Sequence, residues 1–306
     1  MPVQNMLMEK EVLDNYIRAG MIAAKAKREA EKILRPGLSL IVLAETVEKF
    51  IRDNGAEPAF PLNISLNENA AHYTPPYGDR TEIKPGDLVK IDIGAHVDGY
   101  IGDMAFTYCS EKSHLARAAE NILADAIKVI RPGVKVSEIG CAIEDSAKSN
   151  GVGIIVNLTG HTLERFVFHG APGIPNVKND ISHSFNEGDV IALEPFTCPT
   201  NGLIRESGGG AEIFRYLMDR PARLPEARQI LGMARDRFHE LPFAKRWLTA
   251  SMSPVKVAMA MRQLESLGAL EPYPVLREVS GKPIAQAEHT IIVADKPIIT
   301  TRMDDG

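Results

Sequence analysis

Three aspartates lie within one short apolar stretch, IDIGAHVDGYIGDMAF at residues 91–106. The Asp-Gly dipeptide at 98–99 favours a two-residue hairpin turn, which would place Gly94 opposite Asp103. Because strand side chains alternate with period two, Asp92 and Asp103 would lie diagonally on one face, about 7–8 Å apart at the backbone. Two carboxylates that converge among apolar strands repel each other unless a proton or a cation neutralises them. The hairpin therefore predicts a metal-binding pair or, if this face is solvated, two surface acids.

Three further residues could complete an oxygen-rich metal site. Glu194 ends the segment EGDVIALE, Glu288 precedes an apolar run in AQAEHTIIV, and His161 follows a glycine in NLTGHTL. Each of them alone is more often a solvent-facing acid or an ordinary core or loop histidine. Together with Asp92 and Asp103 they provide four carboxylates and one imidazole, a set that can hold two divalent first-row ions. Two such ions, about 3.5–4 Å apart, activate a water molecule and polarise a carbonyl.

Length and composition indicate what class of protein would carry such a site. The chain has 306 residues, of which 44% are hydrophobic and 25% charged, enough for one large or two ordinary globular domains. A formal net charge of −5 gives no general reason to expect DNA binding. The three cysteines show no CxxC spacing, which favours a reduced, cytoplasmic location. Neither a signal-like N-terminus nor an apolar run of roughly 20 residues is evident, so no membrane association is expected.

The elements that must position the candidate ligands are repeated along the chain. An Arg-Pro-Gly step followed by Asn-Gly occurs twice, with an offset of 96 residues (131 − 35). PGDLVKID resembles EGDVIALE in pattern, which places Asp92 and Glu194 at equivalent strand positions. Each half reads as two helices, a strand and a hairpin, and predicts an α+β fold with central strands. The matched segments are 35–37 and 131–133, 54–55 and 150–151, LNIS at 62–65 and VNLT at 156–159, and 85–92 and 187–194.

The segment between Glu194 and Glu288 is longer than a hairpin needs, and the surplus is predicted to be helical. A proline at 254 follows a capping serine, an apolar stripe runs from 257 to 267, and Gly268 ends it. Residues 215–262 contain ten Lys or Arg against four Asp or Glu, a local charge of about +6 (10 − 4). Such a basic face could dock on ribosomal RNA. Ordinary solvated helix faces are the alternative.

Six segments stand out along the chain: SLNENAAHYTPP, IDIGAHVDGYIGDMAF, GHTLERFVFHGAPGIP, LEPF, LEPYPVL and AQAEHTIIV. In order and spacing they resemble the motifs of type II methionine aminopeptidases. The resemblance covers residues 60 to 293 and is closest to the archaeal form, which lacks a long polybasic N-terminal extension. That family has the pita-bread fold, with two pseudo-symmetric halves around a central antiparallel sheet. The resemblance implies a catalytic domain of residues 1–214 and 271–306, with an inserted helical subdomain at 215–270.

The resemblance implies removal of the initiator methionine from new chains whose second residue is small. It makes Asp92 a ligand of one metal, His161 and Glu194 ligands of a second, and Asp103 and Glu288 bridging ligands. The two divalent ions would be Co, Mn, Fe or Zn, because all four suit these donors.

Further residues match active-site positions of the same family. His169 would bind the substrate or an intermediate, His72 would act on the side of the leaving peptide, and Glu194 would shuttle a proton. Phe60, Phe168 and Tyr273 would form the methionine pocket, or else they are core aromatics. The expected partners are N-terminal methionines of nascent chains and, through the basic insertion, transiently the ribosome; the protein is expected to be a cytoplasmic monomer.

Two other functions share this fold. An X-Pro dipeptidase or aminopeptidase P would use the same metal ligands, but the helical insertion and AAHYTPP argue against it. A non-catalytic nucleic-acid- or ribosome-binding protein would not need the complete ligand set.

Overall fold

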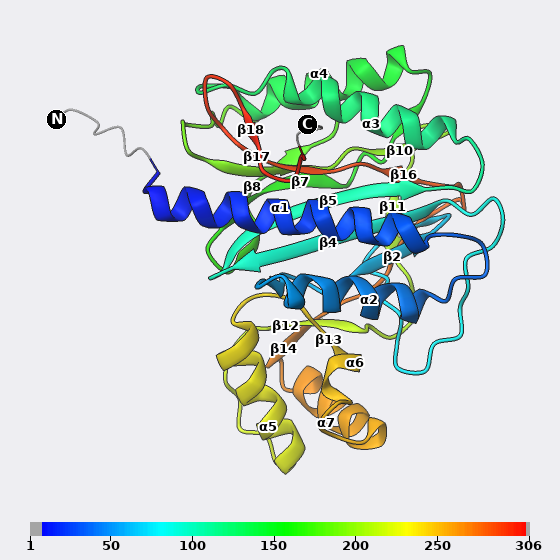
Figure 1. The fold of residues 1–306 in the computed structure, drawn as a ribbon, viewed down its shortest axis with the longest axis vertical. Coiled ribbons are helices and arrows are strands. Elements are labelled where there is room, and N and C mark those ends of the chain that lie inside the picture. The colour runs from blue at the N-terminus through cyan, green and yellow to red at the C-terminus, as the bar shows by residue number, and fades with distance from the viewer. Residues whose placement is uncertain (1–7, 304–306) are drawn as a thin grey trace.

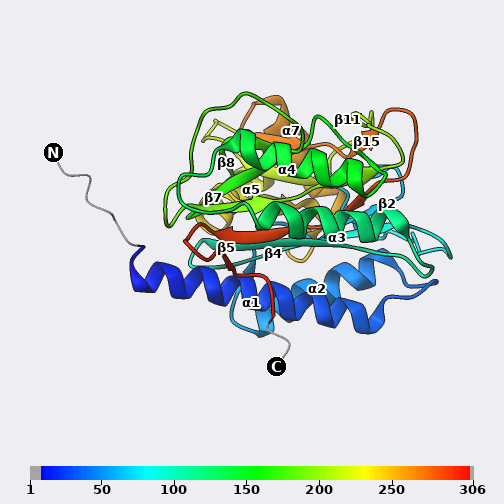
Figure 2. The ribbon, with the colours of Figure 1, turned by 90° about the horizontal axis from the view of Figure 1, so that it is seen from above.

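The computed structural model describes residues 8–303, and its first half is a long strand hairpin covered by two helices. The strands β4 (Val89–Val97) and β5 (Tyr100–Tyr108) pair along their whole length, and α1 (Lys10–Ile33) lies across them (Figure 1). The helix α2 (Leu40–Asp53) packs beside α1 on the same face, as the view from above shows (Figure 2). Buried aliphatic side chains of both helices and of β4 fill the space between these layers. The other strands of this half are β1 (Glu57–Pro58), β2 (Asn63–Leu66) and β3 (Asn69–Ala71).

The second half repeats the arrangement. The helices α3 (His114–Ile127) and α4 (Val136–Ser149) pack together and share a core with the strands of this half. Its strands are β6 (Gly153–Ile154), β7 (Thr159–Glu164), β8 (Val167–Pro175), β9 (Val190–Leu193), β10 (Phe196–Cys198), β16 (Ala285–Gln286), β17 (His289–Ile292) and β18 (Ile298–Ile299). They pair in the orders β18-β17-β9-β7-β8 and β16-β10-β6.

The predicted internal repeat is confirmed in the backbone. All four repeat glycines adopt left-handed φ angles, which only glycine takes up without strain. After the first helix of each pair, the Gly37 N–H donates to the Ile83 carbonyl at 2.8 Å, and the Gly133 N–H donates to the Phe185 carbonyl at 2.7 Å. The two halves therefore share their turns as well as their element order. The glycines are Gly37, Gly55, Gly133 and Gly151.

One predicted strand is wrong. Only the last residue of VNLT, Thr159, belongs to a strand, and Val156 and Asn157 lie in a turn. The Asn157 side chain explains the turn, because it donates to the Ile204 carbonyl and accepts from the Ile204 N–H, both at 2.9 Å. A second difference concerns Glu194, which directly follows β9, whereas its counterpart Asp92 lies within β4.

The segment between Glu194 and Glu288, predicted to be helical, contains strands as well as helices. The helix predicted after Ser253 is α7 (Pro254–Ser266), and the left-handed Gly268 follows its end. The strands β12 (Ile213–Tyr216) and β14 (Leu270–Tyr273) pair at the base of the segment, which therefore has a core of its own. The remaining elements are β11 (Ile204–Glu206), α5 (Pro225–Met233), the π-helix η1 (Ala234–Phe238), β13 (Phe243–Ala244), α6 (Lys245–Leu248) and β15 (Leu276–Glu278).

Hydrogen bonds between β5 and the start of β17 join the two halves. The Glu288 N–H donates to the Ala105 carbonyl at 2.9 Å. The Thr290 hydroxyl accepts from the Asp103 N–H and donates to the Asp103 carbonyl, both at 2.8 Å. These bonds place Asp103 and Glu288, which are far apart in the sequence, side by side in the centre of the molecule.

Candidate metal centre

The β4–β5 hairpin has the predicted register. Asp98 and Gly99 adopt φ angles of 51° and 85°, as a two-residue hairpin turn requires, and Gly94 pairs with Asp103. Asp92 lies two residues before Gly94 on the same face, and both aspartates line one cavity of about 260 Å³. The turn chemistry of a single dipeptide therefore fixes which strand residues face the cavity.

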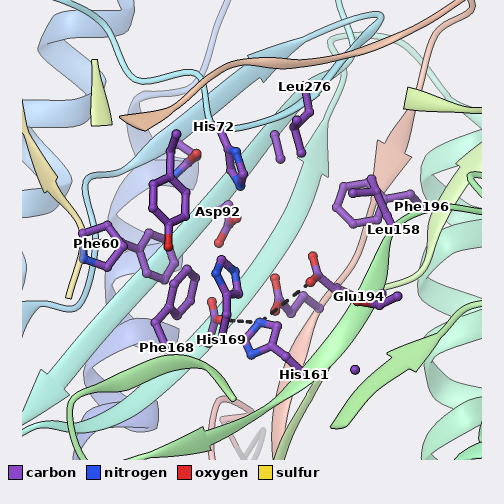
Figure 3. Close-up of a pocket in the computed structure, with 18 of the residues that line it drawn as sticks. Phe60, His72, Asp92, Leu158, His161, Phe168, His169, Glu194, Phe196 and Leu276 are labelled. Carbon is purple, nitrogen blue, oxygen red and sulfur yellow. Dashed lines mark ion pairs between the residues drawn. The ribbon is translucent and has the colours of Figure 1, made fainter. Parts of the chain in front are cut away.

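The other three predicted ligands reach this cavity from the second half. His161 extends from β7, Glu194 follows β9, and Glu288 precedes β17. The His161 Nε2 atom lies 3.6 Å from Asp103 Oδ2 and 3.8 Å from Glu194 Oε1, and dashed lines in Figure 3 mark both contacts. Donor atoms of Asp103, His161 and Glu288 all lie within 4.8 Å of one another. All five predicted ligands thus converge from elements of both halves.

Several carboxylate oxygens of the cluster have no partner among the described residues. They are Asp92 Oδ1, Asp103 Oδ1 and Glu288 Oε1, and all three are buried. Burial raises the pKa of Asp92 to about 7. Burial, followed by the neighbouring carboxylates, raises the pKa values of Asp103 and Glu288 well above their ordinary range. Buried carboxylates that lack both hydrogen bonds and a counter-charge are costly, and a bound cation removes this cost.

The imidazole of His161 is oriented as a metal ligand would be. Its Nδ1 lies 3.2 Å from the Thr162 carbonyl, which can only accept, so Nδ1 carries the proton of the neutral ring. Burial lowers the pKa of His161 to about 4, so the ring is neutral at pH 7. Its Nε2 lone pair therefore faces the oxygens of Asp103 and Glu194. An arrangement of lone pairs facing lone pairs fits a divalent cation between them.

Gln286 belongs to the cluster, and the sequence analysis missed it. Its amide nitrogen lies 3.3 Å from Glu194 Oε2 and 3.3 Å from Glu288 Oε2. The signal for it was present in the sequence, since Gln286 stands two residues before Glu288, a spacing that places alternate strand side chains on one face.

Two further predicted residues, both histidines, line the cavity. The His72 Nδ1 lies 3.2 Å from the Pro274 carbonyl and so carries the proton, and burial lowers the pKa of His72 to about 4. His72 adopts a left-handed φ of 64°, an uncommon conformation for a histidine that often accompanies a functional position. His169 is exposed, and its ring centroid lies 4.8 Å from that of His161 (Figure 3). Both histidines line the cavity and are available to a ligand within it.

Aromatic side chains form one wall of the cavity. The ring centroids of Phe60 and Phe168 lie 4.4 Å apart, and Tyr273 stacks against His169 at 6.0 Å. A Cβ atom on Gly94 would lie 2.2 Å from the Phe60 ring, so only glycine leaves room for this aromatic on the strand. The three predicted pocket residues therefore meet at the cavity, next to the carboxylates. Ile213, next to the inserted segment, and Pro242, within it, add an apolar edge.

The chain is similar in sequence to known metallopeptidases and, over nearly its full length, to methionine aminopeptidases. The sequence model of metallopeptidase family M24 matches residues 14–215. A methionine aminopeptidase of Methanothermobacter thermautotrophicus is 45% identical over 290 residues, which cover 93% of this chain and 97% of that protein. Another from Thermococcus onnurineus is 47% identical, covering 93% and 96% respectively. The chain therefore belongs to metallopeptidase family M24, among its methionine aminopeptidases.

Solved structures show the same fold at low sequence identity. A thermophilic Arx1 superposes with a TM-score of 0.83 at 18% identity, covering 98% of this chain and 93% of that one. The methionine aminopeptidase of Thermotoga maritima gives a TM-score of 0.70 at 21% identity, covering 96% and 98%. A prolidase from Pyrococcus furiosus gives 0.60 at 19% identity, covering 97% of this chain but 65% of that one. The predicted pita-bread, α+β fold is confirmed.

Proposed function

We propose that this enzyme removes the N-terminal methionine from peptides and nascent proteins whose second residue is small. The observation that carries the proposal is the convergence of five donor residues from both halves on one cavity, with buried carboxylate oxygens that have no partner among the described residues. Family membership and the full-length similarity to methionine aminopeptidases support the same reaction.

The donor set supports two divalent ions per chain. Asp92 would hold one ion, His161 and Glu194 the other, and Asp103 and Glu288 would bridge them. Carboxylate and imidazole donors suit Co, Mn, Fe and Zn alike, so the residues do not select one metal. When bound, such ions supply a nucleophile at neutral pH and polarise the scissile carbonyl.

The remaining residues of the site have distinct tasks in this proposal. His169, at the cavity mouth, would donate a hydrogen bond to the substrate carbonyl or to the oxygen that becomes negatively charged. His72 has its proton on Nδ1 and leaves the Nε2 lone pair for the N–H of the departing peptide. Glu194 is 14% exposed at its side chain, the most accessible partner of His161, and would pass a proton to the leaving amine.

Selectivity for methionine would come from the aromatic wall. Phe60, Phe168 and Tyr273 present flat apolar surfaces beside the carboxylates, which suits a flexible thioether that is recognised by packing and sulfur–aromatic contacts. A carbonyl held near the metal ligands would leave the methionine side chain against this wall.

The inserted segment, residues 215–270, is proposed as a subdomain of the catalytic domain formed by residues 1–214 and 271–306. Six of its ten basic side chains form ion pairs with carboxylates, so much of its positive charge is balanced locally. Weak docking on ribosomal RNA would then rest on the exposed arginines Arg220, Arg223, Arg228 and Arg262. A cytoplasmic monomer remains our expectation. None of the described helices is long and apolar enough to cross a membrane.

A peptide panel tests the function directly. Metal-stripped protein, reloaded separately with Co, Mn, Fe or Zn, is assayed on Met-Ala-Ser, Met-Pro-Gly, Met-Leu-Ser, Leu-Ala-Ser and Ala-Pro. We expect methionine release from Met-Ala-Ser and Met-Pro-Gly only, and none without metal. Cleavage of Ala-Pro in preference to the methionine peptides would replace this proposal by an X-Pro dipeptidase. Metal binding without any cleavage would favour a binding protein.

A further inference from the structure

Gln286 combines deep burial with a fixed main chain. Its side chain is 1% exposed, and β16 pairs it with Phe196 of β10. The Thr107 hydroxyl accepts from the Gln286 N–H and donates to the Gln286 carbonyl, both at 2.8 Å. Thr107 lies four residues after Asp103 on β5, so the backbone of Gln286 is tied to the strand that carries a predicted bridging ligand. The amide group is therefore presented at a defined place beside the carboxylates.

The side-chain amide connects two carboxylates that would otherwise repel each other. A primary amide nitrogen has two hydrogens and no charge, and Gln286 Nε2 lies 3.3 Å from one oxygen of Glu194 and 3.3 Å from one oxygen of Glu288. A lysine here would add a positive charge that competes with a metal ion, and a carboxylate would add repulsion. The two N–H groups of the amide provide hydrogen bonds to these oxygens. Because the amide is neutral, the negative charge that attracts a metal ion is unchanged.

The contact also selects which carboxylate oxygen is free. Glu288 Oε2 accepts from Gln286, whereas Glu288 Oε1 is buried and has no partner among the described residues. One oxygen is thus held by the protein, and the other remains for coordination. Outer partners that orient metal ligands in this way commonly determine 10–100-fold of the metal affinity, an order-of-magnitude range.

We propose that Gln286 is a positioning residue that orients Glu194 and Glu288 toward the bound metal ions. This inference rests on the proposed metal-dependent function and assigns to Gln286 a role that is distinct from coordination. It implies that replacing the amide by a group of similar shape, without donors, weakens metal binding even when packing is preserved.

Metal titration of three variants tests the proposal. Gln286→Met keeps an unbranched side chain of similar length without donors, and Gln286→Glu keeps the shape but replaces the amide by a carboxyl group. Thr197→Val is the matched control, because Thr197 is fully buried on neighbouring β10 and its hydroxyl donates to Leu115 and Ala285 carbonyls away from the carboxylates. Calorimetry with Mn²⁺ on metal-stripped protein gives the affinity, and thermal unfolding of the same samples reports their metal-free stability.

We expect Gln286→Met to lose about 10–100-fold in Mn²⁺ affinity while Thr197→Val stays within about twofold of the wild type. Gln286→Glu brings a further acidic group that attracts Mn²⁺, so its affinity should fall less than that of Gln286→Met. At saturating Mn²⁺, kcat on Met-Ala-Ser should fall with little change in KM. Mn²⁺ affinity within twofold of the wild type in Gln286→Met would overturn the proposal and leave Gln286 a packing residue. A wild type that binds Mn²⁺ but cleaves no peptide would instead overturn the proposed function, independently of the variants.

Discussion

A comparison of two buried polar clusters among residues 8–303 shows that they are built in opposite ways. In the first, which we call the Glu48 cluster, Glu48 of α2 meets Arg246 and Trp247 of the inserted segment. Both oxygens of the Glu48 carboxylate accept hydrogen bonds: Oε1 from Arg246 and from the Leu62 N–H at 3.1 Å, and Oε2 from the Trp247 indole at 2.7 Å. Arg246 also donates to the Thr74 hydroxyl at 2.6 Å.

The metal centre contains four carboxylates and no lysine or arginine within the set. The neutral amide of Gln286 donates side-chain hydrogen bonds to the carboxylates of Glu194 and Glu288. Three other buried carboxylate oxygens have no partner among the described residues. In the Glu48 cluster the counter-charge is part of the chain, whereas in the metal centre it must come from solution. A buried charge whose partner belongs to the chain is neutralised by the fold itself, whereas a buried charge without such a partner is characteristic of a binding site.

The largest difference between the clusters should appear on removal of one carboxylate from the metal centre. Asp103→Asn should lower kcat/KM on Met-Ala-Ser by more than about 10³-fold, since losing metal assistance costs several kcal/mol of transition-state stabilisation. The metal-free variant should be at least as stable as the wild type, because the neutral amide replaces a buried carboxyl group that must otherwise take up a proton or repel its neighbours. Peptide assays and thermal unfolding without metal check both statements. Substantial destabilisation of the metal-free variant would contradict our view of this cluster.

Removal of the Glu48 charge should have the reverse effect on stability. Glu48→Gln leaves Arg246 buried without its counter-charge and should lower the free energy of unfolding by about 3–5 kcal/mol. Metal affinity should not change. The double variant Glu48→Gln with Arg246→Met should recover much of this loss, because no unpaired charge stays buried. Urea unfolding gives the free energy of unfolding of the wild type, of Glu48→Gln and of the double variant. If Glu48→Gln is as stable as the wild type, the Glu48–Arg246 ion pair does not stabilise the fold.

The two kinds of titratable group in the metal centre give opposite pH dependence. The pKa of Asp92 is raised to about 7, so its contribution to metal-free stability is present below about pH 4 and lost as the pH rises through 7. The pKa values of His72 and His161 are lowered to about 4, so their contribution is present above about pH 6.5 and lost as the pH falls. Between pH 6.5 and 8.5 the four carboxylates of the metal centre, whose pKa values are all raised, lower the stability as the pH rises. Lys90, whose pKa burial lowers to about 7, contributes in the opposite direction, but four carboxylates outweigh one lysine.

Over that window, thermal unfolding of the metal-free protein should shift to lower temperature as the pH rises. Mn²⁺ should restore the stability, and its affinity should increase by about tenfold per pH unit for each proton released on binding. Melting curves with and without Mn²⁺ measure both trends. A stabilisation by Mn²⁺ that is independent of pH would mean that no proton leaves the carboxylates.

The smallest expected effect concerns the aromatic wall. Phe168→Leu removes a ring that packs against Phe60 and should reduce the preference for Met-Ala-Ser over Leu-Ala-Ser by about tenfold, the order that a modest change of shape in an apolar pocket produces. Metal affinity should be unchanged, since Phe168 donates no ligand atom. Ratios of kcat/KM measure the preference, and an unaltered ratio would assign Phe168 to packing alone.

Much of the candidate site followed from local sequence signals. The Asp-Gly turn set the hairpin register that brings Asp92 and Asp103 to one face, and the repeated glycines marked matching turns in the two halves. The motifs of the family then supplied His161, Glu194 and Glu288, which share the cavity. The strand assigned to VNLT failed because the Asn157 side chain takes a backbone partner that the residue pattern does not reveal.

Features that depend on neighbouring residues could be predicted from the sequence: the turns, the alternation of strand faces, the ends of α7 and the residue types able to bind metal. Which distant residues became partners depended instead on the packing of the whole fold. Glu48 and Arg246 form an ion pair, and Gln286 bridges Glu194 and Glu288, because separate strands and helices pack together around them. Dihedral preferences and side-chain periodicity act over a few residues, whereas the cost of burying a charge is settled by whatever the fold places beside it.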